Sequence, residues 1–365
     1  MNGKSKMQTM TCRPKTYSLI DTGALQHNYK LIRSSLPESC RMMCVVKADC
    51  YGHGIECVNA LCKAGADFFA VSSLQEALQV RQYTDADVLI LSYTPAQDAE
   101  YLLENNFIQT VYSTEYASQL LNTVPDGKKL RVHIKIDTGM NRIGFPYGDI
   151  QSIKNVLSNN AFSVEGIFTH FAASDECNKS SANEQLSRFI SIKEQFGDKY
   201  LYHCANTGAI ISMPDSLFDF ARCGISLYGV SPSDEVRQSG LLPVMKLCST
   251  VVHVHTVRKG ESISYGGTYT AQEECTIATV ACGYGDGVPR AFSSGTVTIN
   301  GHECTVVGRV CMDHLMVDIT DMNEKPKTGD VAVIFGDVEK YARHIGTIPY
   351  EALCMVGKRV QRIII

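Results

Sequence analysis

The sequence predicts an α/β protein with a (β/α)8 barrel, like that of a TIM barrel, followed by a mostly antiparallel β domain. Two observations predict this fold. Up to about residue 245, short apolar runs alternate with stretches of helical spacing, which implies parallel strands joined by helices. From residue 246, β-rich segments are divided by turns containing Gly, Asn and Asp, and no long helical pattern occurs before about residue 338.

Eight strand-like runs justify the barrel. They cover residues 41–47, 67–73, 87–93, 108–113, 130–137, 164–170, 201–206 and 218–224. Helical spacing, as in 73–83 and 183–196, separates them. Eight strand–helix units over roughly 200–250 residues match the size of a (β/α)8 barrel, and a doubly wound open sheet is the alternative.

These patterns place the domain boundary near residue 245. We expect the barrel over 15–245 and the β domain over 246–365. The strand-like run TYSLID at 16–21 precedes the first helical pattern and could pair with either part. The segment from about 1 to 20 could therefore join the β domain.

Composition excludes several classes of protein. The chain has 365 residues, 44% hydrophobic and 20% charged, which is typical of a soluble globular enzyme. A net charge of -4 without a dense Lys/Arg cluster argues against a nucleic-acid partner. The sequence contains no stretch of about 18 apolar residues, so no membrane-spanning helix is predicted. The N-terminus lacks a signal-peptide pattern, and 15 scattered cysteines without a C-x-x-C pair indicate free thiols in the cytoplasm.

Polar residues gather where the expected strands end. The active site of such a barrel lies at the carboxyl ends of its strands. The residues at these ends are Lys47, His133, Lys135, Asp137, Arg142, His170, His203, Asn206, Thr207, Arg222, Gly224 and Ile225. The basic residues at this end of the barrel are either simply solvated or bind an anionic ligand. A metal site is not expected, because clustered carboxylates and closely spaced histidines are absent from this set.

Lys47 ends a buried apolar run, although burying an ammonium group is costly. Its head therefore either reaches solvent or reacts as an amine, since a lysine among other cations has a lowered pKa. The sequences NTG at 206–208 and RCGI at 222–225 offer backbone N–H groups ahead of helices, where a phosphate could bind. Together these features suggest a Schiff base with pyridoxal phosphate.

Eight motifs, in order, resemble those of alanine racemases, which are pyridoxal-phosphate enzymes with a barrel and a β domain. The motifs are VVKADCYGHG, HIKIDTGMNRIGF, THFAASDE, HCANTG, RCGISLYG, SYGGTYTA, GYGDG and GRVCMD. The resemblance extends from about residue 15 to 360. It implies interconversion of L- and D-alanine, a supply of D-alanine for peptidoglycan, a cytoplasmic bacterial enzyme and a homodimer with shared active sites.

The resemblance also implies roles for the barrel residues. Lys47 matches the lysine that covalently holds pyridoxal 5'-phosphate and acts as one catalytic base. The phosphate contacts match Tyr51, Thr207, Gly224, Ile225 and Tyr350, with Thr where the family usually has Ser. Arg222 matches the arginine that faces the pyridine nitrogen, with His170 behind it, and His203 and Asn206 line the same region.

Two further barrel positions, one on the fifth expected strand and one in the loop after it, match family residues. Arg142 resembles an arginine that touches the cofactor's phenolic oxygen and the substrate carboxylate. Lys135 aligns with a lysine that is carbamylated in several members, and the alternative is an ordinary lysine with a bound anion. Asn141 departs from the family's usual Gly, which puts the local backbone geometry in question.

The β domain is expected to supply the second base. Racemisation removes a proton from one face of the α-carbon and delivers one to the other, which a single base cannot easily do. Tyr265 matches the base opposite Lys47 and comes from the neighbouring subunit, as does a methionine matching Met312. Tyr284 and Tyr350 match aromatic residues that narrow the entrance, and Asp313 matches a polar neighbour of the substrate.

Three other functions remain open on this scaffold. The first is a serine racemase, or a dual serine/alanine racemase, and Tyr350 is the main reason to prefer alanine. The second is a pyridoxal-phosphate-binding protein without catalysis, against which Tyr265 argues. The third is a decarboxylase of basic amino acids, which would face the pyridine nitrogen with a carboxylate where this chain has Arg222.

Overall fold

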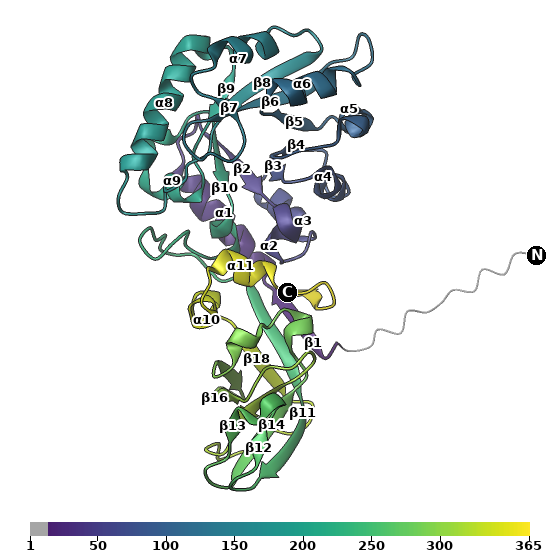
Figure 1. The fold of residues 1–365 in the computed structure, drawn as a ribbon, viewed down its shortest axis with the longest axis vertical. Helices are drawn as coiled ribbons and strands as arrows, with labels where there is room; N and C mark the ends of the chain where they lie inside the picture. The colour runs from purple at the N-terminus through teal and green to yellow at the C-terminus, as the bar shows by residue number, and fades with distance from the viewer. Residues whose placement is uncertain (1–13) are drawn as a thin grey trace, which may run out of the picture. The chain divides into compact units, whose positions relative to one another are not determined.

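The computed structural model describes residues 14–365, and the described chain divides into two compact units. One unit runs from Asp21 to Val244 and also includes Ile365. The other combines the first strand, β1 (Thr16–Ile20), with Met245–Ile364. In Figure 1 the first unit runs from purple to teal, and the second is mainly green and yellow. The N-terminal part of the sequence used to argue against a signal peptide lies largely outside the described residues.

The first unit is a barrel of parallel strands, as expected. Its strands follow the order β10-β2-β3-β4-β5-β6-β8-β9, and the short β7 pairs only with β6. Their bounds are β2 (Arg41–Val45), β3 (Phe68–Val71), β4 (Asp87–Ile90), β5 (Ile108–Val111), β6 (Leu130–Asp137), β7 (Phe145–Pro146), β8 (Phe162–Phe168), β9 (Leu201–His203) and β10 (Phe220–Cys223). Backbone bonds from Asp219 N to Tyr202 O and from Arg222 N to Ala205 O connect β9 to β10 and close the barrel.

Helices cover the outside of these strands (Figure 1). They are α1 (Thr22–Ser35), α3 (Cys57–Ala64), α4 (Leu74–Arg81), α5 (Ala99–Glu104), α6 (Thr114–Leu121), α7 (Ile150–Leu157), α8 (Ser180–Phe196) and α9 (Thr207–Ser212). The segment labelled α2 (Lys47–Tyr51) follows β2 and is a left-handed turn. Ser73 and Ser113 begin α4 and α6, where each hydroxyl accepts a backbone N–H three residues on. The helical spacing seen in 73–83 and 183–196 corresponds to α4 and α8.

The barrel strands bury both faces, which explains their continuous apolar runs. β3 is buried at every position, and Phe68 packs its ring against Phe220 at 4.8 Å between centroids. Arg131 lies near the start of β6 and forms ion pairs with Glu165 at 2.6 Å and Asp87 at 2.7 Å. These charges lie at the amino ends of the strands, away from the mouth, where polar networks serve stability.

The second unit is mostly antiparallel, as expected. Its main sheet follows the order β14-β17-β16-β15-β18-β11-β1-β19, and β14 also pairs with β11. The bounds are β1 (Thr16–Ile20), β11 (Met245–Val257), β14 (Cys275–Val280), β15 (Thr296–Ile299), β16 (His302–Val307), β17 (Leu315–Asp318), β18 (Val331–Phe335) and β19 (Gln361–Ile364). The hairpin β12 (Ser262–Ile263) and β13 (Tyr269–Thr270) is separate, and α10 (Val338–Ile345) and α11 (Pro349–Cys354) come late in the chain.

The first strand belongs with the β domain. β1 pairs antiparallel with β11 and parallel with β19, so the run at 16–21 joins the second unit. Thr16 strengthens this pairing, because its hydroxyl donates to Ala281 O at 2.6 Å and lies 3.0 Å from the Ser249 hydroxyl. All cysteines of the described residues are free thiols.

Candidate active site

Lys47 lies on a left-handed turn rather than at the end of a strand. β2 ends at Val45, and the residues after Lys47, from Ala48 to Tyr51, all have φ between 52 and 55°. A left-handed conformation costs an L-residue about 1–2 kcal/mol, because Cβ approaches the next carbonyl oxygen. Strain of this kind is concentrated at functional sites. Gly52 ends the turn and donates its N–H to Ala48 O at 2.9 Å.

The turn packs against residues that follow β10. The Tyr51 and Tyr228 ring centroids are 4.9 Å apart, and His53 stacks on Tyr228 at 4.6 Å. The Tyr228 hydroxyl donates to Val45 O at 3.1 Å. These contacts direct Tyr51 towards the segment that contains Gly224.

Tyr51, Thr207 and Gly224 form a small polar cradle. A Cβ on Gly224 would lie 2.6 Å from the Tyr51 hydroxyl and 3.7 Å from Thr207 Oγ1, so only glycine allows the Tyr51 hydroxyl to approach this closely. Gly224 N–H donates to Thr207 Oγ1 at 2.9 Å. Hydroxyl groups gathered beside the backbone at the start of a helix are of the kind that binds a phosphate group. Ile225, fully buried, begins the turn that follows.

Asn206 braces this cradle from behind. Its Oδ1 accepts the Ala209 N–H at 3.1 Å, which caps α9, and the Ser174 hydroxyl at 2.5 Å. The side chain thereby fixes the start of α9, where Thr207 lies. Asn206 therefore supports the position of Thr207.

Arg222 is buried in the barrel and held by several acceptors. Its NH1 donates to His203 Nδ1 at 2.7 Å, and its NH2 donates to Thr169 O at 2.7 Å and Cys204 O at 2.9 Å. His170 Nδ1 lies 3.3 Å from the same NH2. The guanidinium is therefore fixed in orientation, with His170 beside it.

Arg222 also fixes the protons of two buried histidines. Because an arginine only donates, His203 Nδ1 must accept, and the His203 proton lies on Nε2, 2.9 Å from His133 Nδ1. Burial, reinforced by Arg222, lowers the pKa of His203 well below its usual range, and burial lowers that of His133 to about 3. Both rings are neutral at physiological pH. The His133 ring lies against Gly166, where a Cβ would be 2.8 Å away.

Lys135 is a lysine of β6 whose amine is buried inside the barrel. Its Nζ is buried without a hydrogen-bond partner among the described residues and lies 5.2 Å from the centre of the Phe168 ring. Burial, followed by the charge of Arg222, lowers the pKa of Lys135 to about 7. A large fraction of this amine is therefore neutral and nucleophilic near neutral pH.

Arg142 lies on an exposed loop shaped by Asp137. The Asp137 carboxylate accepts backbone N–H groups of Gly139 at 2.9 Å, and of Asn141 and Arg142 at 3.1 Å each. Asn141 has φ 53°, a left-handed conformation that Asn tolerates better than most residues. Asn is therefore accommodated at a position where the resemblance leads us to expect Gly.

Gln185 of α8 is a polar residue that sequence reasoning missed. It is 2% exposed, accepts the Ala172 N–H at 2.9 Å, and donates to His170 O at 3.0 Å and Thr138 Oγ1 at 3.3 Å. It therefore ties together the loops after β6 and β8. The sequence feature that could have revealed it is a glutamine on the apolar face of a helix, the face that also carries Leu186 and Phe189.

In the β domain, Tyr265 lies at the tip of the β12–β13 hairpin. Tyr265 is 70% exposed, and Met312 and Tyr284 are 52% and 44% exposed. The Arg309 guanidinium lies beside Gly266, where a Cβ would be 2.9 Å from its NH1. Large exposed apolar side chains on one unit are typical of surfaces that a partner covers.

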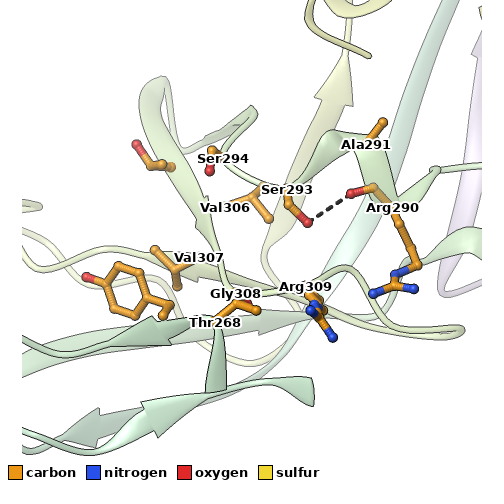
Figure 2. Close-up of a pocket in the computed structure, with 11 residues that line it drawn as sticks. Thr268, Arg290, Ala291, Ser293, Ser294, Val306, Val307, Gly308 and Arg309 are labelled. Atoms are coloured by element: carbon orange, nitrogen blue, oxygen red, sulfur yellow. Dashed lines mark hydrogen bonds between the residues drawn. The ribbon is translucent and has the colours of Figure 1, made fainter. Parts of the chain in front are cut away.

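Arg309 also lines a pocket of about 580 Å³ in the β domain. Figure 2 shows Arg290 and Arg309 on neighbouring segments of its wall, with the Ser293 hydroxyl bonded to Arg290 O at 2.9 Å. Sequence reasoning missed both arginines. Two guanidinium groups give this pocket a positive potential that attracts carboxylates.

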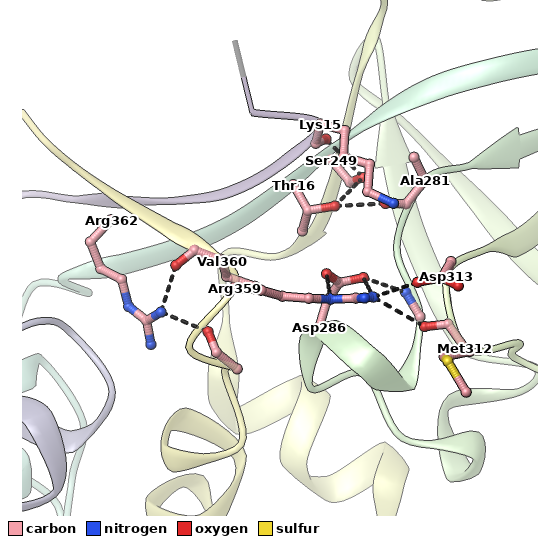
Figure 3. A network of polar contacts seen from close by, with 12 residues as sticks. Lys15, Thr16, Ser249, Ala281, Asp286, Met312, Asp313, Arg359, Val360 and Arg362 are labelled. Carbon is pink, nitrogen blue, oxygen red and sulfur yellow. Dashed lines mark hydrogen bonds and ion pairs between the residues drawn. The ribbon is translucent and has the colours of Figure 1, made fainter. Parts of the chain in front are cut away.

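Asp313 belongs to a charge network centred on Arg359 (Figure 3). Arg359 binds the buried Asp286 with two bonds, at 2.7 and 3.0 Å, and contacts Asp313 Oδ1 at 2.8 Å and Met312 O at 3.3 Å. The network fixes the loops that carry Tyr284 and Met312. Tyr350, the remaining residue of the sequence-derived set, is half-buried at the start of α11.

Within residues 14–365, no three His, Cys, Asp or Glu side chains come together as a metal site. Nor does any helix in that range have the length and apolar character needed to cross a membrane.

Comparisons with known proteins match the whole described fold. The family described as "Alanine racemase, N-terminal domain" matches residues 20–232, and "Alanine racemase, C-terminal domain" matches 244–364. The alanine racemase of Desulforamulus reducens is 40% identical over 95% of this chain and 98% of its own length, and that of Methanococcus maripaludis is 37% identical over 94% and 97%.

Solved structures agree with the sequence relatives. An alanine racemase of Clostridium difficile 630 has a TM-score of 0.92 at 38% identity, covering 97% of this chain and 96% of that one. An alanine racemase of Bacillus anthracis, solved with bound L-Ala-P, has a TM-score of 0.91 at 32% identity, covering 97% and 96%. Fold and matches together define an amino-acid racemase, a kind of isomerase. The chain belongs to the alanine racemase family, as its motifs predicted.

Proposed function

We propose that this protein interconverts L-alanine and D-alanine with pyridoxal 5'-phosphate held covalently by Lys47. The observation that carries the proposal is the left-handed turn after Lys47, which brings the Tyr51 hydroxyl beside Gly224 and Thr207. This cradle suits the cofactor's phosphate. When bound, the cofactor withdraws electrons from the amino acid and makes its α-proton acidic.

Two bases handle the protons in this proposal. The Lys47 amine removes or delivers a proton on one face of the α-carbon, and the Tyr265 phenol does so on the other. Tyr265 comes from the partner subunit of a head-to-tail homodimer, which is consistent with its high exposure. Met312 accompanies it, and Arg309 supplies the positive charge that a phenol needs to act as a base.

The remaining barrel residues orient the reactants. Arg222 retains its proton, so it would hold the cofactor's pyridine nitrogen as a hydrogen-bond donor and favour that nitrogen unprotonated. Arg142 binds the substrate carboxylate. Lys135 reacts with CO2 to form a carbamate, whose negative charge orients Arg142 where an ammonium would repel it; its low pKa and unpartnered amine support this. An ordinary Lys135 beside a bound anion is the alternative.

A small substrate follows from Tyr284 and Tyr350, which narrow the entrance in this proposal. We expect a preference for alanine over serine because of Tyr350. An asparagine at this position would leave room for the hydroxyl of serine and hydrogen-bond it, whereas Tyr350 offers no such amide group. An apolar pocket rejects an added hydroxyl by only about 10²-fold, so some serine racemisation is expected. D-alanine made in the cytoplasm then supplies peptidoglycan.

Three measurements test the proposal. Borohydride reduction of the holoenzyme followed by peptide mapping is expected to fix the cofactor on Lys47, and a label on another lysine contradicts the mechanism.

The kcat/KM for L-alanine should exceed that for L-serine, and the reverse order identifies a serine racemase. A Tyr265→Phe variant should bind cofactor but racemise poorly. A normal rate in that variant removes the second base from the mechanism.

A further inference from the structure

The backbone after Lys47 needs support from outside the turn. From Ala48 to Tyr51 every residue has φ between 52 and 55°, and none is glycine. A single such residue is uncommon, and a run of them relaxes to a right-handed conformation unless other contacts hold it. Because Lys47 directly precedes this run, relaxation would redirect its side chain.

The Glu76 carboxylate makes such a contact. Its Oε1 accepts the Ala48 N–H at 2.7 Å, and its Oε2 accepts the Ser72 N–H at 2.7 Å. One side chain therefore joins the first left-handed residue to the residue that follows β3. Bonds from backbone N–H groups to a carboxylate are stronger than bonds between neutral groups.

Glu76 is itself placed by the neighbouring strand–helix unit. It lies in the first turn of α4, where its N–H donates to the Ser73 hydroxyl at 3.3 Å. α4 follows β3, which pairs in parallel with β2, and Val46 N–H donates to Ala70 O at 2.9 Å. The carboxylate is thus held by elements fixed to the strand that precedes Lys47.

A glutamine would not reproduce these bonds. Each oxygen of the carboxylate faces a backbone donor. A glutamine has one oxygen and one NH2 group, so one donor would face another donor. The two bonds therefore require a carboxylate at this position.

We propose that Glu76 is a positioning residue for Lys47. By holding Ala48 N–H, it maintains the left-handed turn and keeps the Lys47 amine where it can hold pyridoxal phosphate and transfer a proton. The inference rests on the proposed function, in which Lys47 carries the cofactor. Glu76 acts through the backbone of the turn and touches neither substrate nor cofactor.

The test compares Glu76→Gln and Glu76→Ala with the control Glu115→Gln. Glu115 is an exposed residue in the first turn of α6, which also begins after a serine cap. We expect the Glu76 variants to bind pyridoxal phosphate about 10–100-fold more weakly as apoproteins, as measured by absorbance titration. In the reconstituted enzymes kcat should fall while KM for alanine stays within about twofold, since Arg142 lies on another loop. The control should match the wild type.

A second substitution separates positioning from general structural support. Glycine adopts a left-handed conformation without steric cost. Adding Ala48→Gly to Glu76→Ala, or to Glu76→Gln if the alanine variant does not fold, should therefore restore much of the cofactor affinity. Unchanged affinity in the single variants, or no recovery in the double variant, overturns the inference.

The failure of this inference can be distinguished from failure of the proposed function. Borohydride mapping of the wild-type holoenzyme reports only on which lysine carries the cofactor. A label on Lys47 together with unaffected Glu76 variants rejects the role of Glu76 alone. A label on a different lysine rejects both the proposed function and this inference.

Discussion

Lys135 is a residue whose charge depends strongly on burial. Burial, and secondarily Arg222, lowers its pKa from 10.5 to about 7. Between these values the unfolded chain binds a proton that the folded chain has lost, so this residue makes the free energy of unfolding rise with pH. Below about pH 7 both states are protonated, and the destabilising effect of the buried charge is complete.

The pH dependence of stability tests this shift. In carbonate-free buffer, the wild type should gain stability relative to Lys135→Met as the pH rises from about 7 to about 10. Urea unfolding of both proteins across this range measures the difference. Parallel stability curves for the two proteins would show that Lys135 titrates normally.

Gly224 gives a second prediction at the scale of a single residue. In Gly224→Ala the new methyl group would lie 2.6 Å from the Tyr51 hydroxyl and displace it. Loss of a hydrogen bond to a phosphate should weaken cofactor binding at least about tenfold. Gly148→Ala is the matched control, because a Cβ there meets nothing within 4 Å. Equal cofactor affinity in the two variants, by absorbance titration, counts against the cradle.

At the scale of elements, the strands were the most predictable part of the fold. Continuous apolar runs predicted each barrel strand to within a few residues, because both faces are buried. The left-handed turn after Lys47 was not predictable, since Ala, Cys and Tyr disfavour that conformation and a single Asp does not indicate a run of it. Glu76 was equally hidden, because local pattern places it on the polar face of α4. Arg359 and Asp286 meet only through tertiary folding across 73 residues of sequence.

Helix α8 makes a testable contribution to the site. Gln185 links this helix to the loops that carry Arg142 and His170, and Arg188 of the same helix donates to Thr138 O at 2.7 Å. Gln185→Leu leaves the Ala172 N–H and His170 carbonyl unpaired, which should cost about 1–3 kcal/mol of stability. Because the loop that carries Arg142 then loses one of its contacts, KM for alanine should rise more than kcat falls. Unchanged KM together with lower stability would limit Gln185 to a role in folding.

At the scale of the whole molecule, each unit holds only part of the proposed chemistry. The barrel contains Lys47, the phosphate cradle and Arg222, whereas Tyr265, Tyr284 and Met312 belong to the β domain and are largely exposed there. Motif order along the chain identified both parts. It could not establish which chain's Tyr265 serves which Lys47, because sequence order carries no information about symmetry between copies.

Mixing two inactive variants decides that question. In a head-to-tail homodimer, each site combines Lys47 of one subunit with Tyr265 of the other. A heterodimer of Lys47→Ala and Tyr265→Phe subunits therefore has one site with both bases intact and one with neither. After unfolding and refolding together in equal amounts, random pairing should restore about a quarter of wild-type racemase activity, while each variant refolded alone stays inactive. If Lys47 and Tyr265 of one site come from the same chain, the mixture stays as inactive as its components, because every site then lacks one base.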